Sequence, residues 1–289
     1  MAALAPPARA ADVLSWIPGS SVRVEQIIGD CDWQSYDWAD ATGTCKPTVS
    51  RTVTRFDILG NGFGYSFEDD ARMIFLFGDT ISSDPSAVNY HAHDPVAWST
   101  SSDPGGGLLL TLFTNPDGSP LFVEPPGVKM GADDIPNGGI SLPDGVFRVC
   151  NSGADEALAD PHQNAYSVLV RFDETAQTFT TGRTISQLPG GRFVFTALHA
   201  SGPDVYTFGT GNYRASDVFL ARTPATSFWA GAGTQYFAGM AQGSRPGSPR
   251  NRARFRWWRT TRSADRRGPT TRRRSATSPS RARPSCSCG

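Results

Sequence analysis

Three aspartates beside short apolar stretches are the residues of this chain best suited to chemistry. Asp57 lies in Thr-Arg-Phe-Asp-Ile-Leu-Gly, Asp79 follows Phe-Leu-Phe-Gly, and Asp134 opens Asp-Ile-Pro-Asn-Gly-Gly. Crowded carboxyl groups raise one another's pKa, so one can keep a proton near neutral pH while another stays ionised. Hydrolysis of a glycosidic bond needs such a pair, about 5–5.5 Å apart for retention or about 6.5–9.5 Å for inversion. We predict that Asp57 is a general base and that Asp79 or Asp134 is the acid or the group that shifts its pKa.

Four further polar residues are predicted to bind the substrate: His93, Asp94, Asn212 and Arg214. Several of these candidates have a purely structural alternative. Asp94 precedes a proline and Asp79 ends a strand pattern, and aspartates in both settings commonly form turns. His93 is equally compatible with a hydrogen-bonding role at the surface, and Arg214 could brace its own loop by pairing with Asp217.

Motifs of other enzyme classes are absent from the sequence. It contains no P-loop, no Gly-x-Gly-x-x-Gly opening a helix, no Gly-x-Ser-x-Gly and no His-Glu-x-x-His. The acidic run from Asp30 to Asp40 lacks the glycine and the terminal glutamate of a calcium loop. We therefore expect no cofactor and no catalytic metal, and a structural calcium ion on the axis of the fold is the one ion left open.

The elements that must position these residues are short strands. Apolar stretches punctuated by Gly, Pro, Asn and Asp recur throughout the chain, whereas helical periodicity is scarce, which is typical of an all-β protein. They form three sets of four predicted strands: 53–60, 72–80, 94–100 and 108–113; 134–140, 146–150, 166–172 and 179–185; 193–197, 204–210, 218–223 and 229–237. Phe77-Gly78 and Phe208-Gly209 are expected to occupy the same place in their sets.

Four-stranded antiparallel units in series predict a β-propeller, with an irregular sandwich as the alternative. We predict a five-bladed propeller that is incomplete, with about three blades and an N-terminal strand within 16–28. In such a blade the start of the first strand, the end of the second and the start of the third share one rim. The candidate residues, together with Asn151 and His162, would then surround the mouth of a central funnel.

A sharp change in charge divides the chain. Residues 1–243 carry 13 Lys+Arg and 26 Asp+Glu, whereas residues 244–289 carry 14 Arg, no Lys and one acid, which together account for the net charge of zero. We predict a disordered segment or signal remnant over 1–14, a truncated propeller domain over 15–243, and a disordered, frameshifted, non-native tail over 244–289. The alternative for the tail is a basic arm that binds nucleic acid through Arg and the aromatic residues Phe255, Trp257 and Trp258.

The cysteines indicate an exported protein. Cys31 and Cys45 bracket a 13-residue loop with no histidine or further cysteine at metal-binding spacing, which favours a disulfide. Cys150 lies within an apolar strand pattern and is expected to be a buried thiol. No apolar run approaches the roughly 18–20 residues that span a bilayer. We expect a secreted or cell-wall-associated protein.

Several of these segments resemble a known family. They are Asp-Ile-Leu-Gly at 57–60, Phe-Leu-Phe-Gly-Asp-Thr at 75–80, Ile-Pro-Asn-Gly-Gly at 135–139 and the stretch 208–222. The chain resembles, over residues 45–243, an actinobacterial five-bladed propeller family long catalogued as a domain of unknown function. Some members are endo-acting D-arabinanases that cut mycobacterial cell-wall arabinan. The sequence departs from the family after Gly243, where the final blades should follow.

The resemblance implies a glycoside hydrolase that cleaves D-arabinan internally in a cell wall. We therefore expect a monomer that binds a polysaccharide and has no nucleic-acid or membrane partner. Fold alone does not decide function, so two alternatives remain open at this point: a non-catalytic propeller that binds carbohydrate or protein, and an inactive truncated product.

Overall fold

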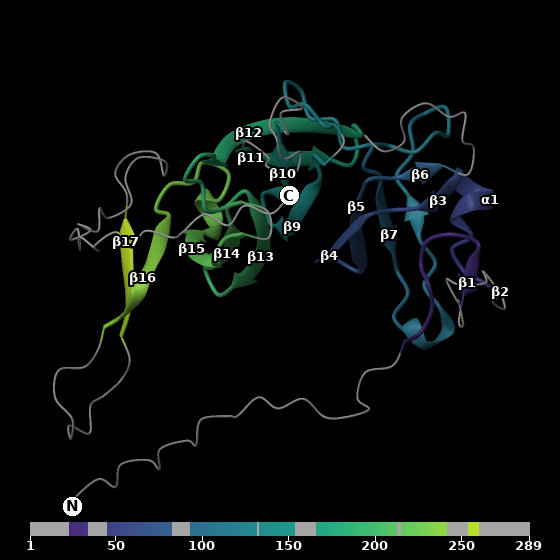
Figure 1. Ribbon diagram of the computed structural model, residues 1–289, viewed down its shortest axis with the longest axis horizontal. Coiled ribbons are helices and arrows are strands. Elements are labelled where there is room, and N and C mark those ends of the chain that lie inside the picture. The colour runs from purple at the N-terminus through teal and green to yellow at the C-terminus, as the bar shows by residue number, and fades with distance from the viewer. Residues whose placement is uncertain are drawn as a thin grey trace, which may run out of the picture.

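A computed structural model describes residues 23–33, 45–82, 93–131, 133–153, 166–212, 215–241 and 254–259. Three antiparallel sheets follow one another along the chain and lie side by side along its longest axis (Figure 1). Within each sheet, every strand pairs with the next strand of that sheet along the chain. The all-β prediction is confirmed, because the one α-helix within the described residues, α1 (Thr52–Phe56), has five residues.

The strands of the three sheets have the following bounds. Sheet 1 contains β4 (Phe63–Asp69), β5 (Arg72–Gly78), β7 (Val96–Ser99) and β8 (Thr111–Leu112). Sheet 2 contains β9 (Pro136–Leu142), β10 (Gly145–Ser152), β11 (Tyr166–Asp173) and β12 (Thr178–Gln187). Sheet 3 contains β13 (Phe195–Ser201), β14 (Asp204–Thr210), β15 (Phe219–Pro224), β16 (Gln235–Ala241) and β17 (Arg254–Arg259). Two small ladders pair β1 (Cys31–Trp33) with β2 (Cys45–Pro47), and β3 (Ile58–Gly60) with β6 (Ile81–Ser82).

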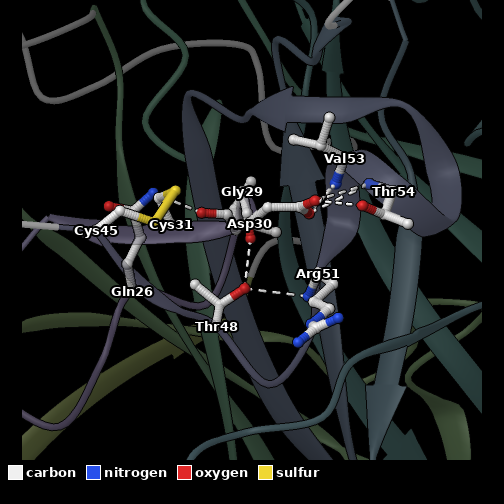
Figure 2. Close-up of a disulfide and its surroundings, with 10 residues drawn as sticks. Gln26, Gly29, Asp30, Cys31, Cys45, Thr48, Arg51, Val53 and Thr54 are labelled. Atoms are coloured by element: carbon white, nitrogen blue, oxygen red, sulfur yellow. Dashed lines mark hydrogen bonds between the residues drawn. A yellow bond between two sulfur atoms is a disulfide. The ribbon is translucent and has the colours of Figure 1, made fainter.

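The predicted first strand of sheet 1 is wrong. Residues 53–60 form α1 and β3, and the first strand of sheet 1 is β4. The glycines around β4 obscured its strand pattern in the sequence. The cause is a cap supplied from outside the segment: the Asp30 carboxylate accepts hydrogen bonds from the backbone N–H groups of Val53 and Thr54 at 2.9 and 3.2 Å (Figure 2). Arg51 and Asp57 flank the helix with φ of 45° and 58°. A tertiary contact thus overrides the strand preference of the β-branched residues.

The disulfide predicted between Cys31 and Cys45 is confirmed, and it joins β1 to β2 beside this cap (Figure 2). Thr48 extends the network, because its hydroxyl donates to the Gly29 carbonyl at 2.6 Å and accepts from the Arg51 N–H at 3.1 Å. The cross-link and the helix cap therefore stabilise one local unit at the edge of sheet 1.

Both ends of the folded region differ from expectation. Residues 23–28 form no strand, so the predicted N-terminal strand is absent from the described part of that segment. Residues 229–234 form turns after a 3-10 helix (Ala225–Ser227), and the last predicted strand begins only at Gln235. Arg254–Arg259 pairs with β16, so regular structure extends beyond Gly243. The frameshift origin of the tail stays a prediction.

The first strands of the three sheets lie next to one another, with β9 between β4 and β13. Gly138 and Gly139 make this approach possible: a Cβ on Gly138 would lie 2.9 Å from the Thr196 hydroxyl, and one on Gly139 would lie 2.3 Å from the Phe67 ring. The Tyr65 hydroxyl reaches past β9 to sheet 3, where it bonds to the backbone C=O and N–H of Leu198 at 3.2 and 3.1 Å. The three sheets therefore converge on their first strands.

Three apolar clusters fill the spaces around the sheets. The first lies between sheets 1 and 2 and is centred on Phe67, Leu76 and Val170. The second lies between sheets 2 and 3 and includes Val149 and Val205. The third covers the outer face of sheet 1, where the segment 27–28 and the α1–β3 region pack on Phe77, Ala97 and Leu110. Within the described ranges, no helix is both long and apolar enough to cross a membrane.

The register of sheets 1 and 3 corrects one further expectation. Phe63 pairs with Gly78 in sheet 1, and Phe195 pairs with Thr210 in sheet 3. Phe208 therefore corresponds to Leu76 and not to Phe77, one residue away from the predicted alignment. Because side chains alternate between the faces of a strand, this shift places Phe208 on the opposite face from the one expected.

Candidate functional site

Asp79 and Asp94 meet where β5 ends and β7 begins. Asp79 adopts a left-handed backbone with φ of 48°, and its N–H donates to Asp94 Oδ1 at 3.2 Å. The neighbouring glycines leave room for these groups, because a Cβ on Gly78 would lie 3.4 Å from Asp94 Oδ1 and one on Gly62 would lie 3.0 Å from the Asp79 Cβ. Asp79 is partly exposed, whereas Asp94 is only 2% exposed.

Asp134 reaches the same place from sheet 2. It closes a turn before β9 in which its N–H donates to the Gly131 carbonyl at 3.0 Å and its Oδ2 accepts from the Gly131 N–H at 3.2 Å. The next residue, Ile135, packs so closely on Gly78 that a Cβ there would lie 2.5 Å from its side chain. The turn thus brings a second buried carboxyl, 1% exposed, against the end of β5.

The three carboxyl groups are electrostatically coupled. Burial raises the pKa of Asp94 well above its usual value, and the charges of Asp79 and Asp134 raise it further, against a lowering by the Asp79 N–H. Asp94 Oδ2 is buried and has no hydrogen-bond partner. The arrangement therefore favours a neutral, protonated Asp94 beside an accessible Asp79.

A relay of buried amides ties this cluster to sheet 3. The backbone N–H and the hydroxyl of Thr196 donate to Asn137 Oδ1 at 3.0 and 3.1 Å. Asn137 Nδ2 donates to Asn151 Oδ1 at 2.7 Å, and Asn151 Nδ2 donates to the Asp133 carbonyl at 3.0 Å. The turn that carries Asp134 is thereby fixed from both neighbouring strands and from the next sheet.

The predicted residues divide into those that the structure brings together and those that it does not. Asp79, Asp94 and Asp134 form one group. Asp57 lies at the end of α1, where its carboxylate accepts a hydrogen bond from the Ser82 hydroxyl, and it is not among the groups whose charges raise the pKa of Asp94. The structure thus gives Asp57 a local structural contact outside the coupled group.

The predicted substrate-binding residues other than Asp94 have separate surroundings. The His93 ring stacks on Phe122 with centroids 4.6 Å apart, and its Nδ1 lies 3.5 Å from a Glu124 carboxylate oxygen. Asn212 is exposed beyond β14, and its carbonyl accepts from a neighbouring loop N–H. Arg214 and His162 lie outside the described residues.

Two buried polar residues gave no signal in the sequence. Asn137 lies in the Pro-Asn-Gly-Gly segment, whose glycines signalled close backbone approach but not an amide relay. Arg148 is fully buried between aromatic rings, with its guanidinium carbon 4.3 Å from the Phe172 centroid, and its side-chain nitrogens make no hydrogen bond. Burial lowers its pKa to about 10. Nothing in its sequence context distinguishes it from an exposed strand arginine.

Metal binding and thiol chemistry find no support at this site. Within the described ranges, no group of three or more His, Cys, Asp or Glu side chains has an arrangement that could hold a metal ion. Cys150 is buried as predicted, and burial raises the pKa of its thiol far above the usual value, so the thiol stays neutral. The coupled carboxyl groups of Asp79, Asp94 and Asp134 are suited to proton transfer.

Comparison with known proteins places the chain in a family. The family model DUF4185, described as a domain of unknown function, matches residues 48–264. The chain belongs to the DUF4185 family. The DUF4185 match contains all three carboxyl groups of the cluster and continues through β17.

One of the solved structures that match the chain is that of a larger protein. It is the crystal structure of a candidate hydrolase from Bacteroides ovatus ATCC 8483, with 11% sequence identity and a TM-score of 0.41. The match covers 71% of the DUF4185 chain and 55% of the other, so this chain spans about half of that protein's length. No curated protein matches the sequence.

Proposed function

We propose that this DUF4185 protein is a glycoside hydrolase that cleaves a cell-wall polysaccharide internally, with D-arabinan as the substrate. The observation that supports the proposal is the pairing of a buried carboxyl of raised pKa, Asp94, with the partly exposed Asp79. Two carboxyl groups whose surroundings push their pKa values apart are the arrangement that glycoside hydrolysis uses.

The roles follow from exposure and charge. Asp79 is the more accessible group, so in this proposal it contacts the sugar as the base or nucleophile. Asp94 is the acid of the pair in this proposal, because burial and the charges of Asp79 and Asp134 raise its pKa. The amide relay through Asn137 and Asn151 holds the turn that carries Asp134 in place. Removing the proton from the cluster should therefore stop turnover.

The finer fold belongs to the same proposal. We take the three sheets to be successive blades of a five-bladed propeller, because their first strands β4, β9 and β13 lie adjacent in order. The Asp79–Asp94–Asp134 cluster would then lie at one rim of the central opening. Secretion to the cell wall agrees with the disulfide, which persists in oxidising compartments.

The test is release of reducing ends from arabinan by the full chain and by two variants. Asp79→Asn should lower kcat by about 10²–10⁴-fold, the usual contribution of a positioned acid or base. Asp144→Asn is the matched control, since Asp144 is exposed in the β9–β10 turn. Asp57→Asn should also retain activity if Asp57 serves only the fold.

The outcomes separate the possibilities. Equal activity of Asp79→Asn and the wild type would remove the cluster from the mechanism. Turnover of another glycan but not of arabinan would overturn the substrate and keep the reaction. Glycan binding without turnover of any polysaccharide would overturn the hydrolase proposal in favour of a carbohydrate-binding protein.

A further inference from the structure

Asn151 on β10 holds the backbone on both sides of Asp134. Its backbone N–H donates to the Ile135 carbonyl at 3.1 Å, and its Nδ2 donates to the Asp133 carbonyl at 3.0 Å. Asn151 is 0% exposed, and Asp134, which lies between these two carbonyls, is 1% exposed. Because one residue makes both hydrogen bonds, a displacement of Asn151 would move the Asp134 carboxyl group relative to Asp94.

Asn137 on β9 connects Asn151 to sheet 3. Its Nδ2 donates to Asn151 Oδ1 at 2.7 Å and to the Val194 carbonyl at 3.0 Å. Its Oδ1 accepts from the backbone N–H and the hydroxyl of Thr196 at 3.0 and 3.1 Å. The amide thus uses both of its N–H donors and both acceptor positions of its oxygen. Rotation of the Asn137 amide would break all four hydrogen bonds, so the position of β13 determines the position of Asn151.

None of the three coupled carboxyl groups comes from sheet 3, yet sheet 3 is connected to one of them through two buried amides. We propose that Asn137 and Thr196 are positioning residues of the carboxyl cluster, which act through Asn151 to fix Asp134 beside Asp94. The inference rests on the proposed function, in which Asp94 is the acid. It extends the working site from sheets 1 and 2 to the first strand of sheet 3.

The surroundings of Asp94 set the size of the expected effect. Titratable groups act on it from three elements: Asp79 at the end of β5, Asp134 before β9, and Cys150 on β10, whose thiol stays neutral because burial raises its pKa. Burial raises the pKa of Asp94 most, and the charges of Asp79 and Asp134 add to it. Two like charges about 6 Å apart that separate by about 2 Å more lose about 0.5 pH unit of coupling at an effective dielectric constant of about 20. A loosened Asp134 turn should lower the Asp94 midpoint by that amount.

Carbon-13 NMR titration of the Asp94 carboxyl group in the full chain tests the proposal. Asn137→Ala breaks the relay, so it should lower the Asp94 midpoint by about 0.5 pH unit and move the alkaline limb of the pH–rate profile on arabinan down equally. Thr196→Val removes only the hydroxyl bond and should give a smaller shift in the same direction, whereas Thr196→Ser should keep the wild-type midpoint. Thr207→Val is the matched control, since Thr207 on β14 is also 7% exposed and takes no part in the relay.

A double-mutant cycle with Asp134→Asn shows whether the shift passes through Asp134. Asp134→Asn should lower the Asp94 midpoint by itself, and adding Asn137→Ala should lower it no further. A lower melting temperature of Asn137→Ala with an unchanged midpoint would mean that the relay is only structural, and it would overturn the proposal. A shift of full size in the Asp134→Asn background would overturn it too.

Two further readouts keep the test decisive. If Asn137→Ala does not fold, the Thr196 variants decide the proposal, because Thr196→Val changes one hydrogen bond and Thr196→Ser restores it. The NMR midpoints are measured without substrate. A wild type that shows the midpoint shifts but no turnover would therefore count against the hydrolase and support the coupling of sheet 3 to Asp94.

Discussion

Replacing Asp94 by asparagine measures how much the buried carboxyl group of Asp94 lowers the free energy of unfolding. Asparagine keeps the shape of the side chain and its Oδ1, which accepts the Asp79 N–H at 3.2 Å in the native protein. It replaces the unpartnered Oδ2 with an amide that can donate toward the carboxylates of Asp79 and Asp134. A buried polar atom without a partner costs about 1–3 kcal/mol, so Asp94→Asn should raise the free energy of unfolding by about that amount.

The same substitution should also change how the stability of the protein depends on pH. Burial and the neighbouring charges raise the pKa of Asp94 in the folded state above the value of about 3.9 in the unfolded chain. The folded protein then binds the extra proton, so the wild type loses stability as the pH rises from about 4 through the raised pKa. The amide in Asp94→Asn does not titrate, so the loss of stability with rising pH that Asp94 causes is absent from this variant.

Urea unfolding of both proteins at a series of pH values measures the two effects, with Asp144→Asn as the control. The expected result is a more stable variant with a smaller loss of stability at rising pH. Under the proposed function the same variant should lose turnover, so stability and activity move in opposite directions. A variant that is less stable at every pH, with the same slope as the wild type, would refute the reasoning.

Three further predictions concern the stability of the scaffold. Replacing Cys31 and Cys45 by serine should cost about 3 kcal/mol, because their disulfide closes a loop of 14 residues in sequence separation, and denaturant unfolding with and without reductant measures this. Gly139→Ala should cost about 1–3 kcal/mol through overpacking against the aromatic ring 2.3 Å away, whereas Gly106→Ala, with open space around it, should be neutral in the same thermal-melt assay. Arg148→Met should leave the melting temperature equal or higher, since it removes a buried guanidinium without hydrogen bonds, and a large drop would mean that its stacking outweighs that cost.

Sheet 2 and the first three strands of sheet 3 could be predicted from sequence because these strands carry long apolar stretches between clear turns. Sheet 1 failed at its first strand because the decisive contact on residues 53–54 comes from Asp30, 23 and 24 positions earlier. Alternation and turn residues are local signals, and a helix cap supplied by a distant loop is not. The same limit applies to the correspondence of Phe208 with Leu76. Strand pairing determines it, and the similarity of the Phe-Gly motifs does not.

The candidate site could be predicted only in part, and the reason is again that some of its contacts are not local in the sequence. Ends of strands mark a rim, so Asp79, Asp94 and Asp134 could be selected from their positions in the chain. Asp57 was chosen on the same ground, but the strand it was thought to open is a helix followed by β3. The amide of Asn137 and the buried Arg148 gave no signal, because burial of a polar side chain depends on which strands pack on it.

Carbon-13 NMR of the aspartate carboxyl groups is the most direct measurement of the central claim, that Asp94 holds a proton because it is buried beside Asp79 and Asp134. The Asp94 signal, assigned by its loss in Asp94→Asn, should stay in the protonated range well above pH 4, and Asp79→Asn should lower its midpoint. A signal that titrates near pH 4, the ordinary range of an aspartate side chain, and that does not respond to Asp79→Asn would contradict the coupled cluster.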